Sequence, residues 1–266
     1  MYDRFNRHIN YLRISVTDRC NLRCTYCMPE EGIQMMNHCD ILSFEEIIEV
    51  ARVAVTLGID KFRITGGEPL VRKDIVKLIA QLASIAGVRD LSLTTNGIFL
   101  EELAQPLKSA GLHRVNISLD TLDPQKFREI TRGGDINAVF RGITAARDAG
   151  IKPIKINCVV FKSSKEQDAT EVKEFGRLNG LDVRFIRQMN LESGEFSVVE
   201  GGNGGNCHQC NRLRLTANGM VKPCLFDEQE FSVREFGAEK ALLNALNCKP
   251  LNGCFNTKGS FYNIGG

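Results

Sequence analysis

The stretch YLRISVTDRCNLRCTYCMPE covers residues 11–30 and carries the strongest pattern in the sequence. It begins with the short apolar run 11–17, which is typical of a buried strand. Three cysteines follow on one loop, Cys20, Cys24 and Cys27, with the spacing C-x3-C-x2-C. Three thiolates on one short loop can hold three corners of an iron–sulfur cubane. The fourth iron would have no protein ligand, so the stretch predicts a strand that ends at a metal site open to a further ligand.

Structural zinc is the alternative occupant of such a loop. A structural zinc site normally takes four Cys or His ligands in a tetrahedron. The loop supplies three cysteines, and the nearest candidates for a fourth ligand are His38 and Cys39. Both a cubane and a zinc ion are therefore compatible with the spacing alone.

Outside this loop, apolar runs alternate with amphipathic stretches as far as residue 188. This alternation is typical of parallel strands joined by crossover helices. The predicted strands are 11–17, 61–65, 90–95, 113–120, 154–160 and 182–188, and the predicted helices are 43–58, 74–87, 99–111, 137–150 and 166–180. We expect Ser43 to cap the first helix and Pro106 to interrupt the third. Six units are fewer than the eight of a closed barrel, so the pattern predicts an α/β fold, a partial (βα)6 TIM-type barrel with function at the carboxyl ends of its strands.

The composition changes near residue 190, which predicts a barrel over 1–190 and a smaller C-terminal region over 191–266. The linker SGEFSVVEGGNGGN (193–206) is too rich in glycine to hold regular structure. After it, two short apolar runs flank a turn at Asn218-Gly219 and predict a hairpin over 212–224. A helix over 234–247 follows.

A second cysteine triad brackets this hairpin. Cys207, Cys210 and Cys224 have the spacing C-x2-C-x13-C. One interpretation is an auxiliary iron–sulfur cluster whose open iron binds a substrate atom. The other is a zinc knuckle or ribbon, which Cys248 or Cys254 would complete.

The overall composition narrows the class of protein. The 266 residues include 34 Lys and Arg against 32 Asp and Glu, a net charge of +2. This balance lacks the basic excess of a duplex nucleic-acid binder. The polar start has no secretory signal, and no apolar run approaches the ~18 residues of a membrane span. We therefore expect a cytoplasmic protein that binds neither membrane nor nucleic acid, and whose ten cysteines serve metal binding or chemistry rather than disulfides.

Two of these motifs together resemble the radical S-adenosylmethionine (SAM) superfamily. The first is the C-x3-C-x2-C loop with Tyr26 before its last cysteine, and the second is Gly66-Gly67-Glu68-Pro69 after the second predicted strand. The resemblance implies a [4Fe–4S] cluster whose open iron chelates SAM. It also implies reductive cleavage of SAM to a 5′-deoxyadenosyl radical.

The sequence around the second triad is similar to the GTP 3′,8-cyclases of molybdenum cofactor biosynthesis. The resemblance rests on CNRLRLT (210–216), PCLF (223–226), LRISVTDRCNLRCTYCMP (12–29) and the final Gly-Gly. It implies abstraction of a hydrogen from the ribose C3′ of GTP and attack of the sugar radical on C8 of guanine. The product would be 3′,8-cyclo-7,8-dihydro-GTP, the first intermediate of molybdopterin synthesis.

The resemblance also implies roles for individual residues and partners. The chain has no phosphate-binding P-loop, so guanidinium groups are the expected phosphate ligands. The implied cluster ligands are Cys20, Cys24 and Cys27, with Cys207, Cys210 and Cys224 for a second [4Fe–4S] cluster. The implied SAM contacts are Tyr26, Gly67, Ser118 and Met189, and the implied catalytic tail is Gly265 and Gly266. The implied GTP contacts are Arg13, Arg63, Thr94, Lys155, Arg212, Leu213 and Arg214, with Arg184 beside them. The expected partners are GTP and a flavodoxin- or ferredoxin-like electron donor, and a homodimer is compatible with the resemblance.

The chain also departs from that family. Family members carry several tens more residues before the second triad, and they commonly have an acidic residue where Arg187 stands. Two rival functions stay open at this point. One is a radical SAM maturase that acts on a peptide or on another nucleotide, with Cys248 and Cys254 as spare cluster ligands. The other is a non-catalytic protein in which both triads bind zinc.

Overall fold

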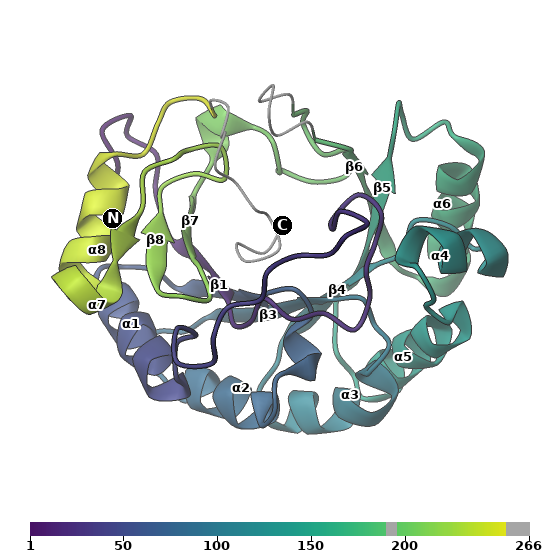
Figure 1. Cartoon of the computed structure of the whole chain (residues 1–266), viewed down its shortest axis with the longest axis horizontal. Helices are drawn as coiled ribbons and strands as arrows, with labels where there is room; N and C mark the ends of the chain where they lie inside the picture. Colours follow the sequence, from purple (N-terminus) through teal and green to yellow (C-terminus); the bar gives the residue numbers. More distant parts are fainter. Residues whose placement is uncertain (190–195, 254–266) are drawn as a thin grey trace.

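The computed structural model describes residues 1–189 and 196–253, so the predicted residues Cys254, Gly265 and Gly266 lie outside the described residues. Six parallel strands form the wall of a partial barrel, with helices around its outer side (Figure 1). The strands are β1 Tyr11–Ser15, β2 Lys61–Thr65, β3 Asp90–Thr95, β4 Arg114–Ser118, β5 Ile154–Val160 and β6 Asp182–Arg187. The helices are α1 Phe44–Thr56, α2 Ile75–Ala83, α3 Leu100–Ser109, α4 Pro124–Thr131, α5 Ile136–Asp148 and α6 Gln167–Asn179, with a short 3-10 helix η1 at Pro69–Val71. The predicted α/β barrel of six strands is confirmed.

Strand order explains why the barrel is partial. Within the described residues the sheet runs β6-β5-β4-β3-β2-β1-β7-β8-β9, and its two end strands are not paired with each other. The added elements are η2 Cys207–Gln209, β7 Arg212–Leu215, β8 Met220–Lys222, β9 Phe231–Ser232, α7 Val233–Phe236 and α8 Ala238–Asn247. The predicted hairpin is confirmed as β7 and β8, which pair antiparallel. The predicted helix over 234–247 is two helices, because the backbone of Gly237 takes a positive φ of 75° between them.

The segment after residue 196 adds to the barrel sheet itself. Strand β7 pairs in parallel with β1, and Tyr11 lies opposite Arg212 and Arg13 opposite Arg214. A parallel partner must run in the same direction as β1, so the amino ends of both strands meet at one end of the barrel. The linker and hairpin therefore return the chain to the amino end of the first strand.

Each strand has an apolar outer face and a polar inner face. On β4, Val115 and Ile117 are fully buried in the core between sheet and helices. Their neighbours Arg114, Asn116 and Ser118 alternate with them and so face the inside of the barrel. This alternation departs from ordinary parallel strands, which are apolar on both faces.

Local signals account for most helix boundaries, with two corrections. Ser43 and Glu46 form the predicted capping box at the start of α1. The prediction that Pro106 interrupts the third helix is wrong, since α3 continues through it to Ser109. Helix α4 was not predicted, although Asp123 and Pro124 are a strong start signal: Asp123 accepts hydrogen bonds from two backbone N–H groups of the first turn.

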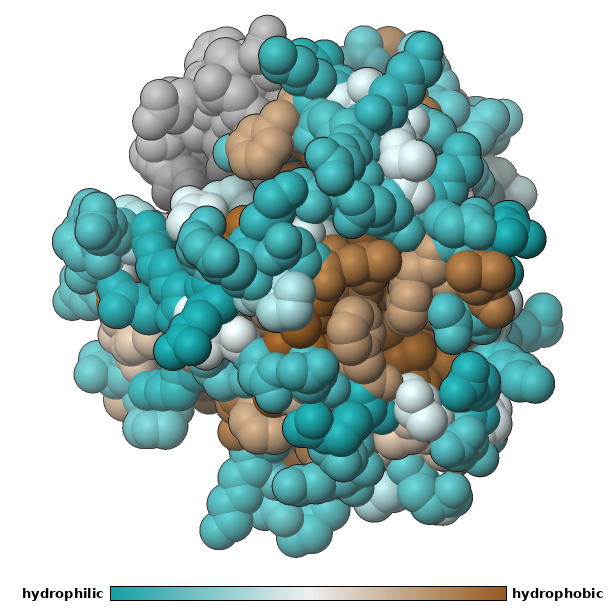
Figure 2. All heavy atoms as spheres, turned by 90° about the vertical axis from the view of Figure 1, so that its right-hand side faces the viewer, coloured by the Kyte–Doolittle hydropathy of each residue, from teal (hydrophilic) through white to brown (hydrophobic). Residues whose placement is uncertain are grey.

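The side of the molecule that carries α4, α5 and α6 is shown in space-filling form in Figure 2. Apolar side chains gather near the centre of this face, within a largely hydrophilic surface. Among the exposed apolar residues, Leu178 lies on α6 and Phe161 follows β5. No helix in the part of the chain that the structure describes has the length and apolar character that a bilayer crossing requires.

The capping box makes a prediction about stability. Replacement Ser43→Ala removes the acceptor for the Glu46 N–H, at a distance of 3.2 Å, and should lower the free energy of unfolding by about 1 kcal/mol. Urea denaturation measures this loss. Ser84→Ala is the control, because the exposed Ser84 hydroxyl only donates to the Gln81 carbonyl. An equal loss in both variants would contradict a specific role for the cap.

Candidate functional site

The first cysteine loop is held against the turn after β2 by backbone contacts. The Gly67 N–H donates to the Thr17 carbonyl at 2.8 Å, and the Glu68 N–H donates to the Arg19 carbonyl at 2.8 Å. A Cβ atom on Gly67 would lie 2.4 Å from the Arg19 carbonyl oxygen. Glycine is therefore required here so that the two loops can approach, one residue before Cys20.

A buried carboxylate joins this turn to the end of β3. Glu68 is 1% exposed and accepts hydrogen bonds from the Thr95 hydroxyl at 2.8 Å and from the Asn96 N–H at 2.7 Å. Burial raises the pKa of Glu68 to about 7, against the lowering effect of these donors. The Asn96 amide in turn donates to Asn21 at 2.8 Å and contacts the Cys20 thiol. Strand β3 thus fixes the start of the cysteine loop.

The end of the loop is anchored to β4 and β5 through Tyr26. Its hydroxyl donates to the Asp120 carboxylate at 2.6 Å, and that carboxylate also accepts from the Val159 N–H at 2.8 Å. Burial raises the pKa of Asp120 and, more strongly, that of Tyr26. Tyr26, predicted as a SAM contact, therefore has a structural partner of its own.

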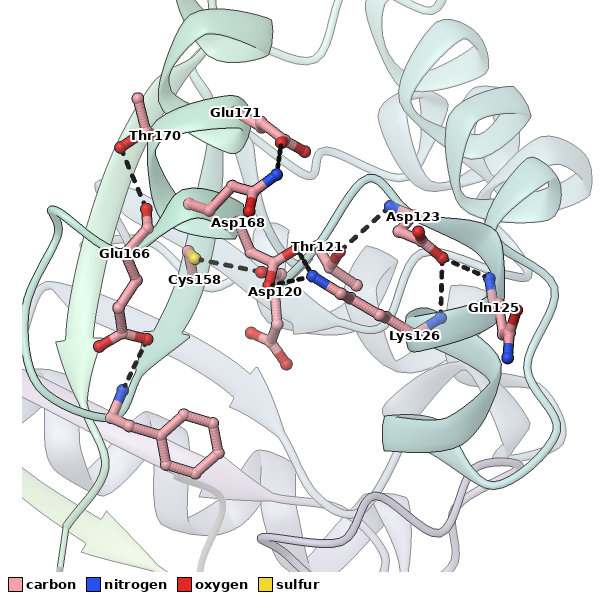
Figure 3. A network of polar contacts seen from close by, with 12 residues as sticks. Asp120, Thr121, Asp123, Gln125, Lys126, Cys158, Glu166, Asp168, Thr170 and Glu171 are labelled. Carbon is pink, nitrogen blue, oxygen red and sulfur yellow. Dashed lines mark hydrogen bonds and ion pairs between the residues drawn. The ribbon is translucent and has the colours of Figure 1, made fainter.

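Figure 3 shows the polar network around Asp120, which connects the ends of β4 and β5 to α4 and α6. The Thr121 hydroxyl donates to Asp168 at 2.7 Å, and Lys126 on α4 pairs with the same carboxylate at 3.1 Å. The Asp120 carboxylate points away from this network (Figure 3). The Asp120 carboxylate instead accepts the hydrogen bond from Tyr26 of the cysteine loop.

Helix α4 holds the middle of the loop. The Arg23 N–H donates to the Thr131 carbonyl, and the Thr25 N–H donates to the Ile130 carbonyl at 2.9 Å. Beyond the helix, the Arg132 guanidinium donates to the carbonyls of Arg23 and Met28, both at 3.0 Å. The unpredicted helix is therefore a main support of the predicted metal loop.

The surroundings of the loop raise the pKa of all three thiols, so a thiolate there needs a compensating positive charge. Burial is the main cause that raises the pKa of both Cys24 and Cys27 to about 12, and the neighbouring thiols and Asp120 add to it. No three His, Cys, Asp or Glu side chains in the described ranges converge on the position of a single metal ion. A cubane puts a separate iron at each thiolate, so it suits three neighbouring thiols that do not converge.

The second triad lies at the opposite end of the barrel. Cys210 precedes β7 by two residues and Cys224 follows β8 by two, while Cys20 follows the carboxyl end of β1. Because β7 is parallel to β1 and β8 returns antiparallel, both Cys210 and Cys224 lie at the amino end of β1. The Cys207 carbonyl is also held there, since it accepts from buried Arg7 at 2.7 Å.

A buried lysine lies between the thiols of the second triad. Lys249 is 1% exposed, and its ammonium donates to the carbonyls of Arg212 and Pro223, each at 2.8 Å, and to the Cys210 sulfur. Burial alone would raise the pKa of Cys210, but Lys249 and Arg212 outweigh it and lower that pKa to about 7. Cys210 is therefore already biased toward the thiolate that a metal ion needs.

Besides Arg114, which is paired with Asp90, five arginines lie on the inner face between the two triads, a group that we name the cation wall. Its members are Arg13 on β1, Arg63 on β2, Arg184 on β6, and Arg212 and Arg214 on β7. Burial is the main cause that lowers the pKa of Arg13, Arg63 and Arg184, and it lowers that of Arg214 to about 10. Their mutual repulsion lowers these pKa values further. Arg13, Arg63 and Arg214 are buried and the other two are half-buried, and guanidinium groups in such a position favour an anionic ligand.

Several buried polar atoms on the inner face have no protein partner in the described part of the chain. They are the Tyr11 hydroxyl, the Thr94 hydroxyl, both amide atoms of Asn116, and the Nε atoms of Arg184 and Arg212. The ring of Tyr11 lies between the guanidiniums of Arg63 and Arg212, at 5.5 and 6.0 Å from its centroid. Buried polar groups are normally hydrogen-bonded, so this concentration on one face marks a ligand site.

The remaining predicted residues are distributed along the same face, with two exceptions. Lys155 lies opposite Asn116 and pairs with Asp182 at 3.1 Å, and Ser118 ends β4. The Leu213 side chain is fully buried in the core on the outer face of β7. Met189, which follows β6, packs against Leu225 and Phe226, the two residues after Cys224.

Sequence reasoning missed the residues that hold the site together. Glu68 and Asp120 were visible as carboxylates at strand ends, but their acceptor roles depend on neighbours from other strands. Arg7 and Lys249 gave no local signal, because their partners are carbonyl groups of distant residues. The pairing of Asp123 with Pro124 was the one missed signal that the sequence did contain.

Comparisons with known proteins agree with this geometry. The profile described as "Radical SAM superfamily" matches residues 14–176. A "GTP 3′,8-cyclase" of Thermodesulfovibrio yellowstonii is 40% identical over 312 aligned positions, covering 97% of this chain and 97% of that protein. A "GTP 3′,8-cyclase" of Geobacter sulfurreducens is 44% identical and covers 89% and 86%. The 312 positions exceed the 266 residues of this chain, so the alignment contains gaps in this chain.

Solved structures share the fold at low identity. The structure of Streptococcus suis SuiB bound to precursor peptide SuiA matches with a TM-score of 0.70 and 17% identity, covering 97% of this chain and 71% of that one. Native anSMEcpe with bound AdoMet matches with a TM-score of 0.64 and 16% identity, covering 96% and 87%.

The close approach at Gly67 makes a prediction about the first triad. Gly67→Ala would force the Arg19 backbone away from β2 and should abolish iron binding by the Cys20 loop, measured as iron per chain after anaerobic reconstitution. Gly150→Ala is the matched control, because Gly150 has a positive φ of 74° but open space around its Cβ position. It should lose stability without losing iron. Full iron content in the Gly67 variant would contradict the role of this contact.

Proposed function

The chain belongs to the radical SAM superfamily and, within it, to the GTP 3′,8-cyclase family, and on this premise we propose that it converts GTP to 3′,8-cyclo-7,8-dihydro-GTP, the first step of molybdopterin synthesis. Membership of the superfamily implies one [4Fe–4S] cluster and SAM. The observation that supports GTP as the substrate is the cation wall, which lies between the two cysteine triads. It offers the guanidinium donors that a triphosphate needs in a chain without a P-loop.

Residues at the carboxyl end of the barrel would hold the cluster and SAM. Cys20, Cys24 and Cys27 are the cluster ligands in this proposal, and Tyr26, Gly67 and Ser118 are the SAM contacts from this end. Met189, whose side chain packs against Leu225 and Phe226, is the fourth proposed SAM contact. When bound there, a reduced cluster would supply the electron for the reductive cleavage of SAM. The protein contributes a fixed geometry, because the loop is anchored to β2, β3, β4, β5 and α4. Anchoring of this kind keeps the reacting atoms close and excludes water.

Residues of the cation wall would orient GTP. Arg13, Arg63, Arg212 and Arg214 bind the triphosphate in this proposal, together with Thr94, Lys155, Arg184 and the backbone of Leu213. Neighbouring guanidinium groups repel one another, so each holds its proton less tightly and the group as a whole binds a polyanion more tightly. The ribose C3′ of GTP would then face the carboxyl end, where the radical forms. A triphosphate offers several anionic oxygens to a group of guanidiniums, which favours a nucleotide over the peptide maturase alternative.

The second triad would hold an auxiliary [4Fe–4S] cluster that orients the purine. Cys207, Cys210 and Cys224 are its proposed ligands. Thiolates of a cluster in a buried site need compensating positive charge, and Lys249 supplies it through its contact with Cys210. A structural zinc site in this position would need a fourth Cys or His ligand.

The remaining features of the proposal concern partners and the chain ends. A flavodoxin- or ferredoxin-like protein would donate electrons, and Gly265 and Gly266 would reach the reacting groups. The division into a barrel over 1–190 and a C-terminal region over 191–266 stays a prediction, as does a homodimer. All nine described cysteines are free thiols, which supports a reducing, cytoplasmic setting.

The substrate assignment predicts a split between two reactions. Replacing both Arg212 and Arg214 with Gln removes two charges from the cation wall but keeps polar side chains of similar reach. GTP-dependent product formation should fall by at least about 100-fold, since charge-assisted phosphate contacts contribute about 1.5–3 kcal/mol each. Reductive cleavage of SAM to 5′-deoxyadenosine should continue. Exposed Arg177→Gln, on α6, is the control. Undiminished cyclisation in the double variant would exclude this phosphate site.

The auxiliary cluster predicts an iron count. Two cubanes correspond to about eight irons per chain after anaerobic reconstitution, and Cys210→Ser should lower this to about four. Cys158→Ser is the control, because Cys158 is a buried thiol of β5 in neither triad. Zinc in place of iron and sulfide at the second triad would overturn the auxiliary cluster.

A further inference from the structure

The glycine-rich segment between β6 and the second triad folds into a compact turn. We name residues 199–204 the glycine turn. As predicted for this composition, it contains no helix or strand. Its ends nevertheless meet, because the Val199 N–H donates to the Gly204 carbonyl at 2.8 Å and the Gly202 N–H donates back to the Val199 carbonyl at 3.2 Å. The turn is therefore fixed by its own backbone.

The glycine turn occupies the free edge of β6. In the described part of the sheet β6 pairs only with β5, so its other edge has no partner strand. Glu200 closes this edge at one point: its N–H donates to the Phe185 carbonyl at 3.1 Å, and the Phe185 N–H donates to the Glu200 carbonyl at 3.0 Å. The Ser164 hydroxyl also donates to the Glu200 carboxylate at 2.5 Å. The turn is thus attached both to β6 and to the loop before α6.

Two consecutive glycines bring the turn onto the side chain of Arg184. Gly201 has a positive φ of 79°, and a Cβ atom on it would lie 2.7 Å from the Val183 carbonyl oxygen. A Cβ atom on Gly202 would lie 3.3 Å from Arg184 Nε and 3.4 Å from its Cδ. The backbone of Gly202 is not in the left-handed region. A side chain at position 202 would therefore disturb the approach to Arg184 rather than the backbone conformation.

Arg184 is the member of the cation wall that lies on this edge of the barrel. The other members are on β1, β2 and β7, whereas β6 is an end strand of the sheet. Besides burial, which is the largest cause, the charges of Arg114 on β4 and Arg212 on β7 lower the pKa of Arg184. Its guanidinium therefore extends into the barrel toward those strands. The Nε atom is buried and has no protein partner among the described residues.

An arginine in this position needs support to keep one direction. The side chain of arginine has several rotatable bonds, and ordering them on binding costs conformational entropy. An edge strand offers neighbours on one side only. The glycine turn supplies the other side, because it packs against the Cδ and Nε of the half-buried Arg184. A side chain that is ordered before the ligand arrives binds that ligand more tightly.

We propose that the glycine turn is a positioning element for an anionic ligand, in which Gly202 is the positioning residue. By packing against Arg184 it holds the guanidinium inside the barrel, facing the arginines of β1, β2 and β7. The inference rests on the proposed function and deepens it, since GTP supplies the polyanion that these arginines bind. It assigns a role in substrate affinity to a segment that touches the substrate only through Arg184.

The test compares substitutions at position 202 in anaerobically reconstituted protein, titrated separately with GTP, inorganic triphosphate and SAM. Gly202→Val places branched carbons where the Arg184 guanidinium group begins, so its affinity for GTP and for triphosphate should fall by about 10-fold. Gly202→Ala should cause a smaller loss, of about threefold, and it carries the comparison if the valine variant does not fold. The affinity for SAM should stay unchanged in both variants.

A double-mutant cycle separates positioning from a merely structural role. Arg184→Ala should itself lower the affinity for triphosphate by about 10-fold, and adding the substitution at Gly202 should then have no further effect, because no guanidinium is left to displace. Losses that add in the double variant would overturn the inference. So would a triphosphate affinity that stays at the parent value in the folded Gly202 variants.

Gly180→Ala is the control for loss of stability near β6. Gly180 has a positive φ of 64° and open space around its Cβ position, so this variant should unfold at a lower temperature and keep all three affinities. A parent protein that binds triphosphate but not GTP would overturn the proposed function, and the triphosphate titrations would still decide the role of the turn. A parent protein that binds neither would overturn both.

Discussion

The parallel pairing of β7 with β1 is the contact on which the rest of the site depends. It sets Arg212 opposite Tyr11 and Arg214 opposite Arg13, so two arginines from a distant segment join those of the barrel. The same pairing directs the chain so that Cys210 enters at the amino end of β1, while Cys20 leaves at its carboxyl end. One strand pairing therefore fixes both the cation wall and the opposite placement of the two cysteine triads.

The cation wall stores unfavourable electrostatic energy in the folded protein. Burial and mutual repulsion lower the pKa of Arg13, Arg63, Arg184 and Arg214. The Tyr11 ring offsets part of this, since Arg63 and Arg212 lie over it, and a cation over an aromatic face is attracted to it. A bound polyanion would lower this electrostatic energy further, because its charges attract every guanidinium of the group. Because the arginines are already in place, the binding energy is not spent on collecting them.

The first cysteine loop shows a different principle, in which rigidity is assembled from short contacts to several elements. The turn after β2 approaches the loop backbone at Gly67, β3 reaches it through Asn96, and β4 and β5 reach Tyr26 through Asp120. Each contact is an ordinary hydrogen bond or a close packing of backbone. Together they fix a loop that has no regular secondary structure, which is the arrangement a metal site on a loop requires.

The sequence by itself determined the local features of this protein. Alternating apolar runs predicted six strands within two residues of their bounds, because burial on the helix-covered face imposes a period that is visible along the chain. The spacing of Cys20, Cys24 and Cys27 determined the first metal loop, since all three thiols lie within eight consecutive residues. Tertiary structure alone decided that β7 joins β1, that the two triads lie at opposite ends of the barrel, and that Glu68, Asp120, Arg7 and Lys249 support the site. The physical reason is that these contacts join residues far apart in sequence, whose partners are backbone groups or single side chains and leave no periodic pattern.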